Sequence, residues 1–142
     1  SGTAVFNIFN FTATINQTGG ASGITRGVYI NPAITAAVDF RAIDVTNGSI
    51  KLPYRAVSAT ASITNNDYFI DVTSGNITLT LPTSVGGSGR IYKIKNSGTG
   101  SVTIATTSSQ TIDATTTKLL NTQYAGLEIT SDNTNWKITG TF

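Results

Sequence analysis

The side chains that could do acid–base chemistry in this sequence are its carboxylates, because the chain contains no His and no Cys. Two pairs of aspartates stand close together, Asp39 with Asp44 and Asp67 with Asp71. A glycosidase needs two carboxyl groups about 5 to 9.5 Å apart. In a strand, residues four apart share a face at about 13 Å, and residues five apart lie on opposite faces. Neither pair is arranged locally for catalysis, and we expect no enzyme unless carboxylates of different chains meet.

The sequence offers no metal or cofactor site that we recognise. Imidazole and thiolate ligands are absent with His and Cys. The run Gly86-Gly87-Ser88-Gly89 precedes an expected strand and lacks the Gly-Lys-Ser/Thr ending of a phosphate-binding loop. We therefore expect no cofactor and no metal.

A cluster of side chains near the C-terminus could bind a sugar. Trp136 stands close to Asp132, Asn133 and Asn135, and Tyr124 is the nearest tyrosine before them. Aromatic rings can stack on the apolar face of a pyranose, and carboxylates and amides can bond its hydroxyls. The alternative is a tryptophan buried in a hairpin against Ile129 and Ile138, with tyrosines in the core or at an interface. Both interpretations stay open at this point.

The charge pattern argues against nucleic acid and membrane partners. Charged residues make up 11% of the chain and its net charge is +2. The nine Lys and Arg are dispersed, with Arg90, Lys93 and Lys95 as the one local group, which suits a solvated strand face. No apolar run approaches the roughly 20 residues that span a bilayer. The start at Ser1-Gly2, without Met or a visible signal peptide, indicates a cleaved tag or a fragment of a longer chain.

The elements that position these side chains are expected to be strands. Thr, Ile, Val and Tyr are abundant, and Gly, Asn, Asp and Ser interrupt them at short intervals, which is typical of sandwiches and barrels. In the second half we expect successive hairpins: residues 68–72 with 77–81, 90–95 with 101–104, and 127–129 with 136–138. Pro82 should end the second of these strands, because proline cannot donate to a ladder.

The first half is less regular. Phe6, Ile8, Phe9 and Phe11 make both faces of one expected strand apolar, so that strand requires cover on two sides. Asn47-Gly48 predicts a hairpin between residues 39–45 and 49–52. Residues 33–37, after Pro32, could form one short helical turn. We place a small, uncharged linker at residues 57–62, between a segment of residues 1–56 and a head domain of residues 63–142. The first segment is short for a core of its own, which points to an oligomer.

The order of turns and apolar positions resembles a β-module found near the ends of bacteriophage tail fibres and in related prophage proteins. The similar stretches are Asp67–Thr73, Thr78–Pro82, Gly89–Asn96, Gly98–Ile104, Thr111–Asp113 and Ser131–Trp136. Thr14–Gly19, Gly23–Pro32 and Asp39–Ile43 resemble the fibre segments that precede such modules, notably in phages and prophages of Bacteroidetes-type bacteria. One departure is Asn133, where the pattern more often has Gly; Asn also tolerates the left-handed region.

The resemblance implies an all-β homotrimer, in which an intertwined N-terminal β segment precedes a small antiparallel β-sandwich or barrel-like head. It implies a location in the virion, in the tail fibre, and receptor binding to a host cell-surface glycan or protein. Two alternatives remain: a purely structural fibre or capping module, and a secreted bacterial adhesin or carbohydrate-binding module.

Overall fold

The computed structural model describes residues 28–33, 35 and 39–142 of the chain. The chain divides into two compact units, Ser1–Gly48 and Ser49–Phe142. Every strand of the described residues belongs to the second unit, and no helix is found among them. The all-β fold predicted from the sequence is confirmed for this part of the chain.

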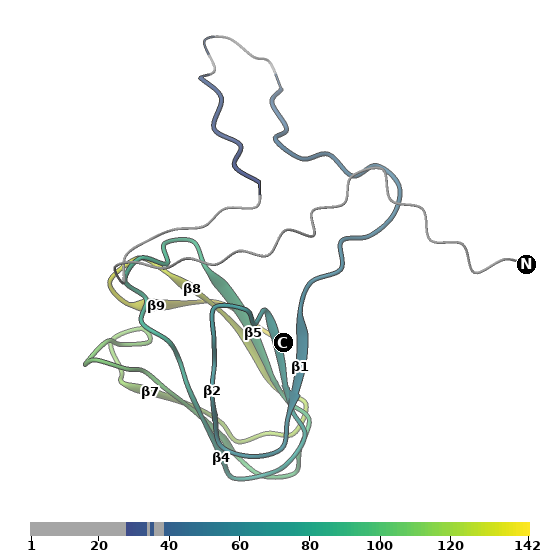
Figure 1. Cartoon of the computed structure of the whole chain (residues 1–142). Coiled ribbons are helices and arrows are strands. Elements are labelled where there is room, and N and C mark those ends of the chain that lie inside the picture. Colours follow the sequence, from purple (N-terminus) through teal and green to yellow (C-terminus); the bar gives the residue numbers. More distant parts are fainter. Residues whose placement is uncertain (1–27, 34, 36–38) are drawn as a thin grey trace, which may run out of the picture. The chain divides into compact units, whose positions relative to one another are not determined.

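Nine strands of the second unit form two sheets, which enclose the core between them (Figure 1). The five-stranded sheet, here called sheet A, has the order β1 (Tyr54–Val57), β3 (Phe69–Val72), β5 (Ile91–Asn96), β8 (Gly126–Ser131) and β9 (Trp136–Thr141). The four-stranded sheet, called sheet B, has the order β2 (Ala61–Ser62), β4 (Ile77–Thr80), β6 (Val102–Ala105) and β7 (Thr117–Leu120).

The chain alternates between the two sheets for its first six strands. β1, β3 and β5 lie parallel in sheet A, and β2, β4 and β6 lie parallel in sheet B. Three successive two-strand coils are therefore stacked on one another. Antiparallel strands then complete both sheets, β7 beside β6 and the pair β8–β9 beside β5.

The core follows from alternation of apolar and polar residues along each strand. In β3, Ile70 and Val72 are buried while their neighbours are half-buried, and β4 repeats the pattern with Ile77 and Leu79. The fully buried side chains with the largest volume are Trp136, Tyr92, Ile70, Leu79, Leu81, Ile94, Ile104, Ile112, Leu127 and Ile129. Both sheets contribute, so the core is the layer between them.

Glycines allow the turns of neighbouring coils to stack closely. A Cβ on Gly75 would lie 2.7 Å from Cα of Gly100, and one on Gly98 would lie 2.7 Å from the carbonyl oxygen of Ser74. Both obstacles are backbone atoms, which cannot move aside as a flexible side chain can. The turn before β4 and the turn before β6 therefore require glycine at their contact.

The prediction of an antiparallel head is wrong in part, because both sheets are mixed. Residues 68–72 and 77–81 were expected to pair as a hairpin, and so were 90–95 and 101–104, but in each case the two strands enter opposite sheets. The hairpin of 127–129 with 136–138 is confirmed as β8–β9. Apolar and polar residues alternate along a half-buried strand whether the next strand in sequence pairs with it or faces it across the core, so the pattern does not distinguish the two arrangements.

The predicted boundary also needs correction. Residues 57–62, expected to be a linker, include the end of β1 and all of β2, which pair with β3 and β4 inside the head. Tyr54 and Arg55 likewise belong to the head, and the division falls between Gly48 and Ser49.

The described residues before Tyr54 form no strand, so the hairpin expected at Asn47-Gly48 is absent, although Gly48 has φ +106°. The strand expected around Phe6–Phe11 and most of the helical turn expected at 33–37 lie outside the described residues. Intertwining of residues 1–56 and the trimer concern contacts with other chains, and both stay predictions.

Candidate ligand-binding surface

Trp136 is a core residue and not a sugar platform. Its side chain is 0% exposed, and its ring lies 5.4 Å from the ring of Tyr92 with a tilt of 40°. Burial raises the pKa of Tyr92, whose hydroxyl donates to the carbonyl of Thr64 over 3.0 Å. The indole N–H of Trp136 has no hydrogen-bond partner. A ligand cannot reach this ring, so the prediction of Trp136 as a contact residue is wrong and the alternative of burial is confirmed.

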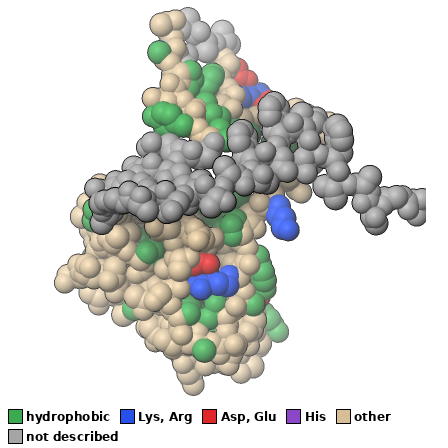
Figure 2. Space-filling view, viewed as in Figure 1, with side chains coloured by type: hydrophobic (Ala, Val, Ile, Leu, Met, Phe, Trp, Pro, Cys, Tyr) green, Lys and Arg blue, Asp and Glu red, His purple; other side chains and the backbone are tan. Residues whose placement is uncertain are grey.

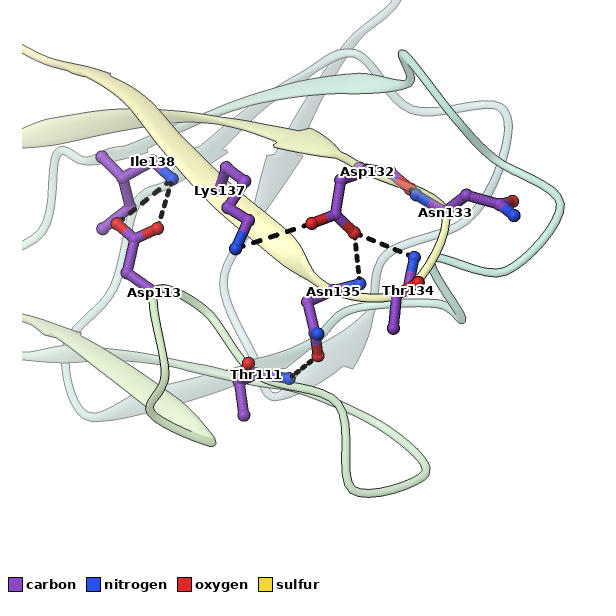
Figure 3. Close-up of polar contacts among 9 residues, drawn as sticks. Thr111, Asp113, Asp132, Asn133, Thr134, Asn135, Lys137 and Ile138 are labelled. Carbon is purple, nitrogen blue, oxygen red and sulfur yellow. Dashed lines mark hydrogen bonds and ion pairs between the residues drawn. The ribbon is translucent and has the colours of Figure 1, made fainter.

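Asp132 organises the turn between β8 and β9 (Figure 3). Its Oδ1 accepts from the backbone N–H groups of Asn135 at 2.6 Å and of Thr134 at 2.9 Å, and Lys137 Nζ lies 3.5 Å from Oδ2. The hydrogen bonds from Asn135 and Thr134 hold the pKa of Asp132 below its ordinary value. The carboxylate is therefore engaged in shaping the turn.

The two asparagines of this turn join it to other loops. Oδ1 of Asn135 accepts from the backbone N–H of Thr111 at 2.8 Å, as Figure 3 shows, and Oδ1 of Asn133 accepts from that of Gly86 at 2.8 Å. Asn133 has φ 76°, the left-handed conformation for which Gly or Asn is suited. These contacts are structural, and they do not bring the predicted ligand-binding residues together around an accessible ring.

Of the two predicted aromatic contact residues, Trp136 and Tyr124, the structure leaves Tyr124 accessible. Its side chain is 63% exposed, its φ is 68°, and its backbone N–H donates to Asn96 O over 2.6 Å. The Nζ atom of Lys95 lies 5.9 Å from the centre of its ring, within reach of a cation–π interaction. Tyr124 thus belongs to the surface of sheet A, beside β5, and not to the β8–β9 turn.

A second aromatic group on the outer face of sheet A was not predicted. Tyr54, which is 62% exposed, stacks on Phe69 at 5.7 Å with an interplanar angle of 15°. Its hydroxyl donates to Oδ2 of Asp71 over 2.8 Å, and Ser97 donates to Oδ1 of the same carboxylate over 2.5 Å. The hydrogen bond to Asp71 raises the pKa of Tyr54. The carboxylate orients the exposed phenol on the edge strand.

The strand register brings these groups side by side. Tyr54 is paired with Phe69, Phe69 with Lys93, and Asp71 with Lys95, all pointing away from the core. Adjacent strands are about 4.8 Å apart. The carboxylate of Asp71 and the ammonium of Lys95 therefore lie on neighbouring strands between the two aromatic groups.

Two further features frame this face. Lys93 Nζ lies 3.1 Å from Oε2 of Glu128, which raises the pKa of Lys93 and lowers that of Glu128. The exposed ring of Phe142 covers Gly126, where a Cβ would collide with it. We call the outward side chains of Tyr54, Phe69, Asp71, Lys93, Lys95, Tyr124, Glu128 and Phe142 the sheet A surface.

The sheet A surface has the chemistry of a saccharide contact. Exposed rings with a polar edge offer apolar faces, and Asp71 and Lys95 supply an acceptor and donors for hydroxyl groups. Figure 2 shows few charged side chains among the coloured atoms on the side of the molecule that it presents. Alternation along β3 could have shown that Phe69 and Asp71 point outward, but not that β1 and β5 flank them.

Asp39, Asp44 and Asp67 are held in ion pairs, and Asp113 accepts from the backbone N–H of Ile138. Asp39 and Asp44 both contact Arg41 at 2.8 Å, although they were expected to lie on opposite strand faces. Asp67 Oδ1 lies 3.0 Å from Nε of Arg55. Within residues 28–33, 35 and 39–142, no group of three or more acidic, His or Cys side chains could hold a metal ion. The same residues contain no helix that is long and apolar enough to span a membrane.

No protein-family model matches the sequence, and no curated protein matches it. The function must therefore be argued from the residues and their geometry.

Proposed function

We propose that this chain is the distal part of a bacteriophage tail fibre, which forms a homotrimer and attaches the virion to a glycan on the host surface. The observation that supports attachment is the sheet A surface, where two exposed aromatic groups flank Asp71 and Lys95. The motif resemblance described above supports the setting in a virion. In this proposal the chain binds and does not catalyse, and it needs no cofactor.

The glycan would contact the two ends of the sheet A surface at once. Tyr54 and Tyr124 are both more than half exposed and lie on either side of β3 and β5. With three strand spacings of about 4.8 Å between β1 and β8, the two rings are separated on the scale of a short oligosaccharide. A host protein with exposed sugars or hydroxyl groups is a partner of the same chemistry.

The trimer is supported by apolar side chains that the chain leaves exposed. Large exposed apolar side chains in contiguous segments mark interaction sites. Among the described residues from 28 to 52, the exposed large apolar side chains are Val28, Tyr29, Ile30, Phe40, Ile43, Val45, Ile50 and Leu52. Other copies of the chain would remove them from water, which agrees with a first segment that is too short for its own core.

A printed array of bacterial surface polysaccharides tests attachment. We expect the wild type to bind a subset of them, and Tyr124→Ala to weaken that binding at least tenfold, because one exposed ring is lost. Val85→Ala is the matched control: it shortens an exposed apolar side chain in the loop after β4 and should leave binding unchanged. Wild-type protein that binds no polysaccharide and no host cell would contradict attachment.

A purely structural fibre module is the second candidate, and the exposed apolar residues of 28–52 favour it, since assembly alone would explain them. The two proposals differ in the array result. A structural module forms the trimer and binds nothing on the array, whereas the attachment module does both.

A further inference from the structure

The Asn47-Gly48 pair lies at the end of the first unit, Ser1–Gly48. Both residues are exposed and belong to no strand. The pair is the one place in the sequence where glycine follows asparagine. Because the hairpin expected here is absent, no strand pairing holds the amide of Asn47 or the peptide nitrogen of Gly48.

Neither of these two groups is engaged by other parts of the fold. Among the described residues, the side-chain amide of Asn47 and the backbone N–H of Gly48 make no hydrogen bond. A Cβ added at Gly48 would have no atom within 4 Å, so the surroundings of this residue are open. Glycine itself has no Cβ that could shield its nitrogen. The nitrogen of Gly48 is therefore accessible to the amide carbon of Asn47.

We propose that Asn47 is a site of spontaneous deamidation, a reaction whose one co-reactant is water. The nitrogen of Gly48 loses its proton to solvent and bonds to Cγ of Asn47, the Cγ–Nδ2 bond breaks, and ammonia leaves. The product is a five-membered succinimide. Water then adds to one of the two ring carbonyls, whose bond to the nitrogen of Gly48 breaks as that nitrogen regains a proton. Opening at Cγ gives aspartate, and opening at the backbone carbonyl gives isoaspartate.

Deamidation changes both the charge and the backbone at this position. Either product carries a carboxyl group that is ionised at neutral pH, so the formal net charge of +2 falls by one unit. In isoaspartate the main chain runs through the side-chain carbon, which lengthens it by one atom. The end of the first unit therefore changes as the protein ages. Neither the trimer nor the ligand is needed for this reaction.

The fold should protect another asparagine that precedes a small residue. Asn96 is followed by Ser97, but it is fully buried, and its Nδ2 donates to three backbone carbonyl oxygens. The N–H of Ser97 donates to the carbonyl oxygen of Val72 over 2.8 Å. Both reacting groups are held in place, so Asn96 should react only in the unfolded chain, whereas Asn47 reacts in the folded chain.

Peptide mapping of the full chain, incubated in mildly alkaline buffer made with heavy-oxygen water, tests the proposal. We expect the peptide that contains Asn47 to take up one solvent oxygen and to yield aspartate and isoaspartate forms. This should occur at least tenfold faster than at Asn121, which is exposed but precedes Thr122. Gly48→Ala should slow the reaction at Asn47 at least tenfold, because the added methyl group shields the attacking nitrogen.

The same mapping in urea separates the effect of the fold from that of the sequence. We expect urea to leave the rate at Asn47 unchanged and to raise the rate at Asn96. A rate at Asn47 that does not exceed the rate at Asn121, or that is the same in Gly48→Ala, would overturn the proposal. At least tenfold acceleration of Asn47 in urea would also overturn it, because the folded chain would then protect this residue.

Discussion

Asn96 is predicted to be the polar side chain on which the head depends most. It is fully buried at the end of β5, and its Nδ2 donates to the carbonyl oxygens of Gly100 at 2.7 Å, Leu120 at 3.2 Å and Thr122 at 3.3 Å. One amide thus ties the turn before β6 to the end of β7 and to the loop before β8. The backbone carbonyl of Asn96 also accepts from the backbone N–H of Tyr124, so this residue helps to position the exposed ring.

Replacing this donor with a carboxylate should destabilise the head severely. In Asn96→Asp the amide N–H groups are lost, at about 1 kcal/mol for each hydrogen bond, and an anion faces carbonyl oxygens in a buried site. Leaving a buried charge without a compensating partner costs about 3 to 5 kcal/mol. For a unit of this size, we expect Tm to fall by about 12 °C or more. Asn121→Asp, at an exposed position, is the control and should change Tm little.

The loss should depend on pH with a defined sign. Burial would raise the pKa of the new carboxyl above its ordinary value of about 3.9, so the folded state favours the protonated form. The deficit relative to wild type should therefore be smaller at about pH 4 and grow as pH rises to about 8. Urea unfolding followed by the fluorescence of Trp136, the one tryptophan of the chain, measures it at equal protein concentrations. Equal midpoints for variant and wild type, or a deficit that is the same at both pH values, would refute this role of Asn96.

Three further results are expected. Gly100→Ala should destabilise the head by about 1 to 3 kcal/mol, because the added Cβ meets the backbone of Gly75 in the adjacent turn, and thermal unfolding with an unchanged Tm would contradict it. Asp132→Asn should make the free energy of unfolding fall less steeply as the pH is lowered. The pKa of Asp132 is lowered in the folded state, so its carboxylate contributes stability that is present above the unfolded pKa and is lost as pH falls through the folded pKa. Urea titrations at several pH values measure this, and a variant with the same acid dependence as the wild type would refute the contribution of Asp132. Asp71→Asn should move the raised pKa of Tyr54 toward its ordinary value, because the hydrogen-bonded anion is gone. Absorbance titrations with and without Tyr54→Phe isolate the signal of Tyr54 in the wild type and in Asp71→Asn. The same pKa of Tyr54 in both proteins would contradict the contact.

The strand positions were largely readable from the sequence. Residues 77–81 were expected as a strand with Ile77 and Leu79 on one face, and β4 is Ile77–Thr80 with both residues buried. Alternation and turn residues carry this information locally. They do not say which sheet a strand joins, because the turn from β3 to β4 sends the chain across the core instead of reversing it within one sheet. The parallel coils were missed for this reason.

The candidate site shows the same limit. Trp136 was a reasonable contact residue by type, but its burial depends on Tyr92 and Ile112, which are distant in sequence. Tyr124 was predicted as a contact residue because it is an aromatic residue near turn residues, and the structure leaves it exposed. Tyr54 was not found, since its neighbours Phe69 and Asp71 are set by a parallel register that the sequence alone does not reveal. The predicted linker at 57–62 also assigned Tyr54 to the first segment and Phe69 to the head, so the sequence analysis did not consider that the two rings could stack.

Amide hydrogen exchange tests the central claim, attachment through the sheet A surface, most directly. The full chain is compared by mass spectrometry with and without the array polysaccharide that it binds best. Protection is predicted for peptides that cover β1, β3, β5 and residues 121–126, while peptides of β4 and β6 keep the exchange of the unbound protein. Protection confined to sheet B, or to the β8–β9 turn around Asp132, would contradict attachment through sheet A.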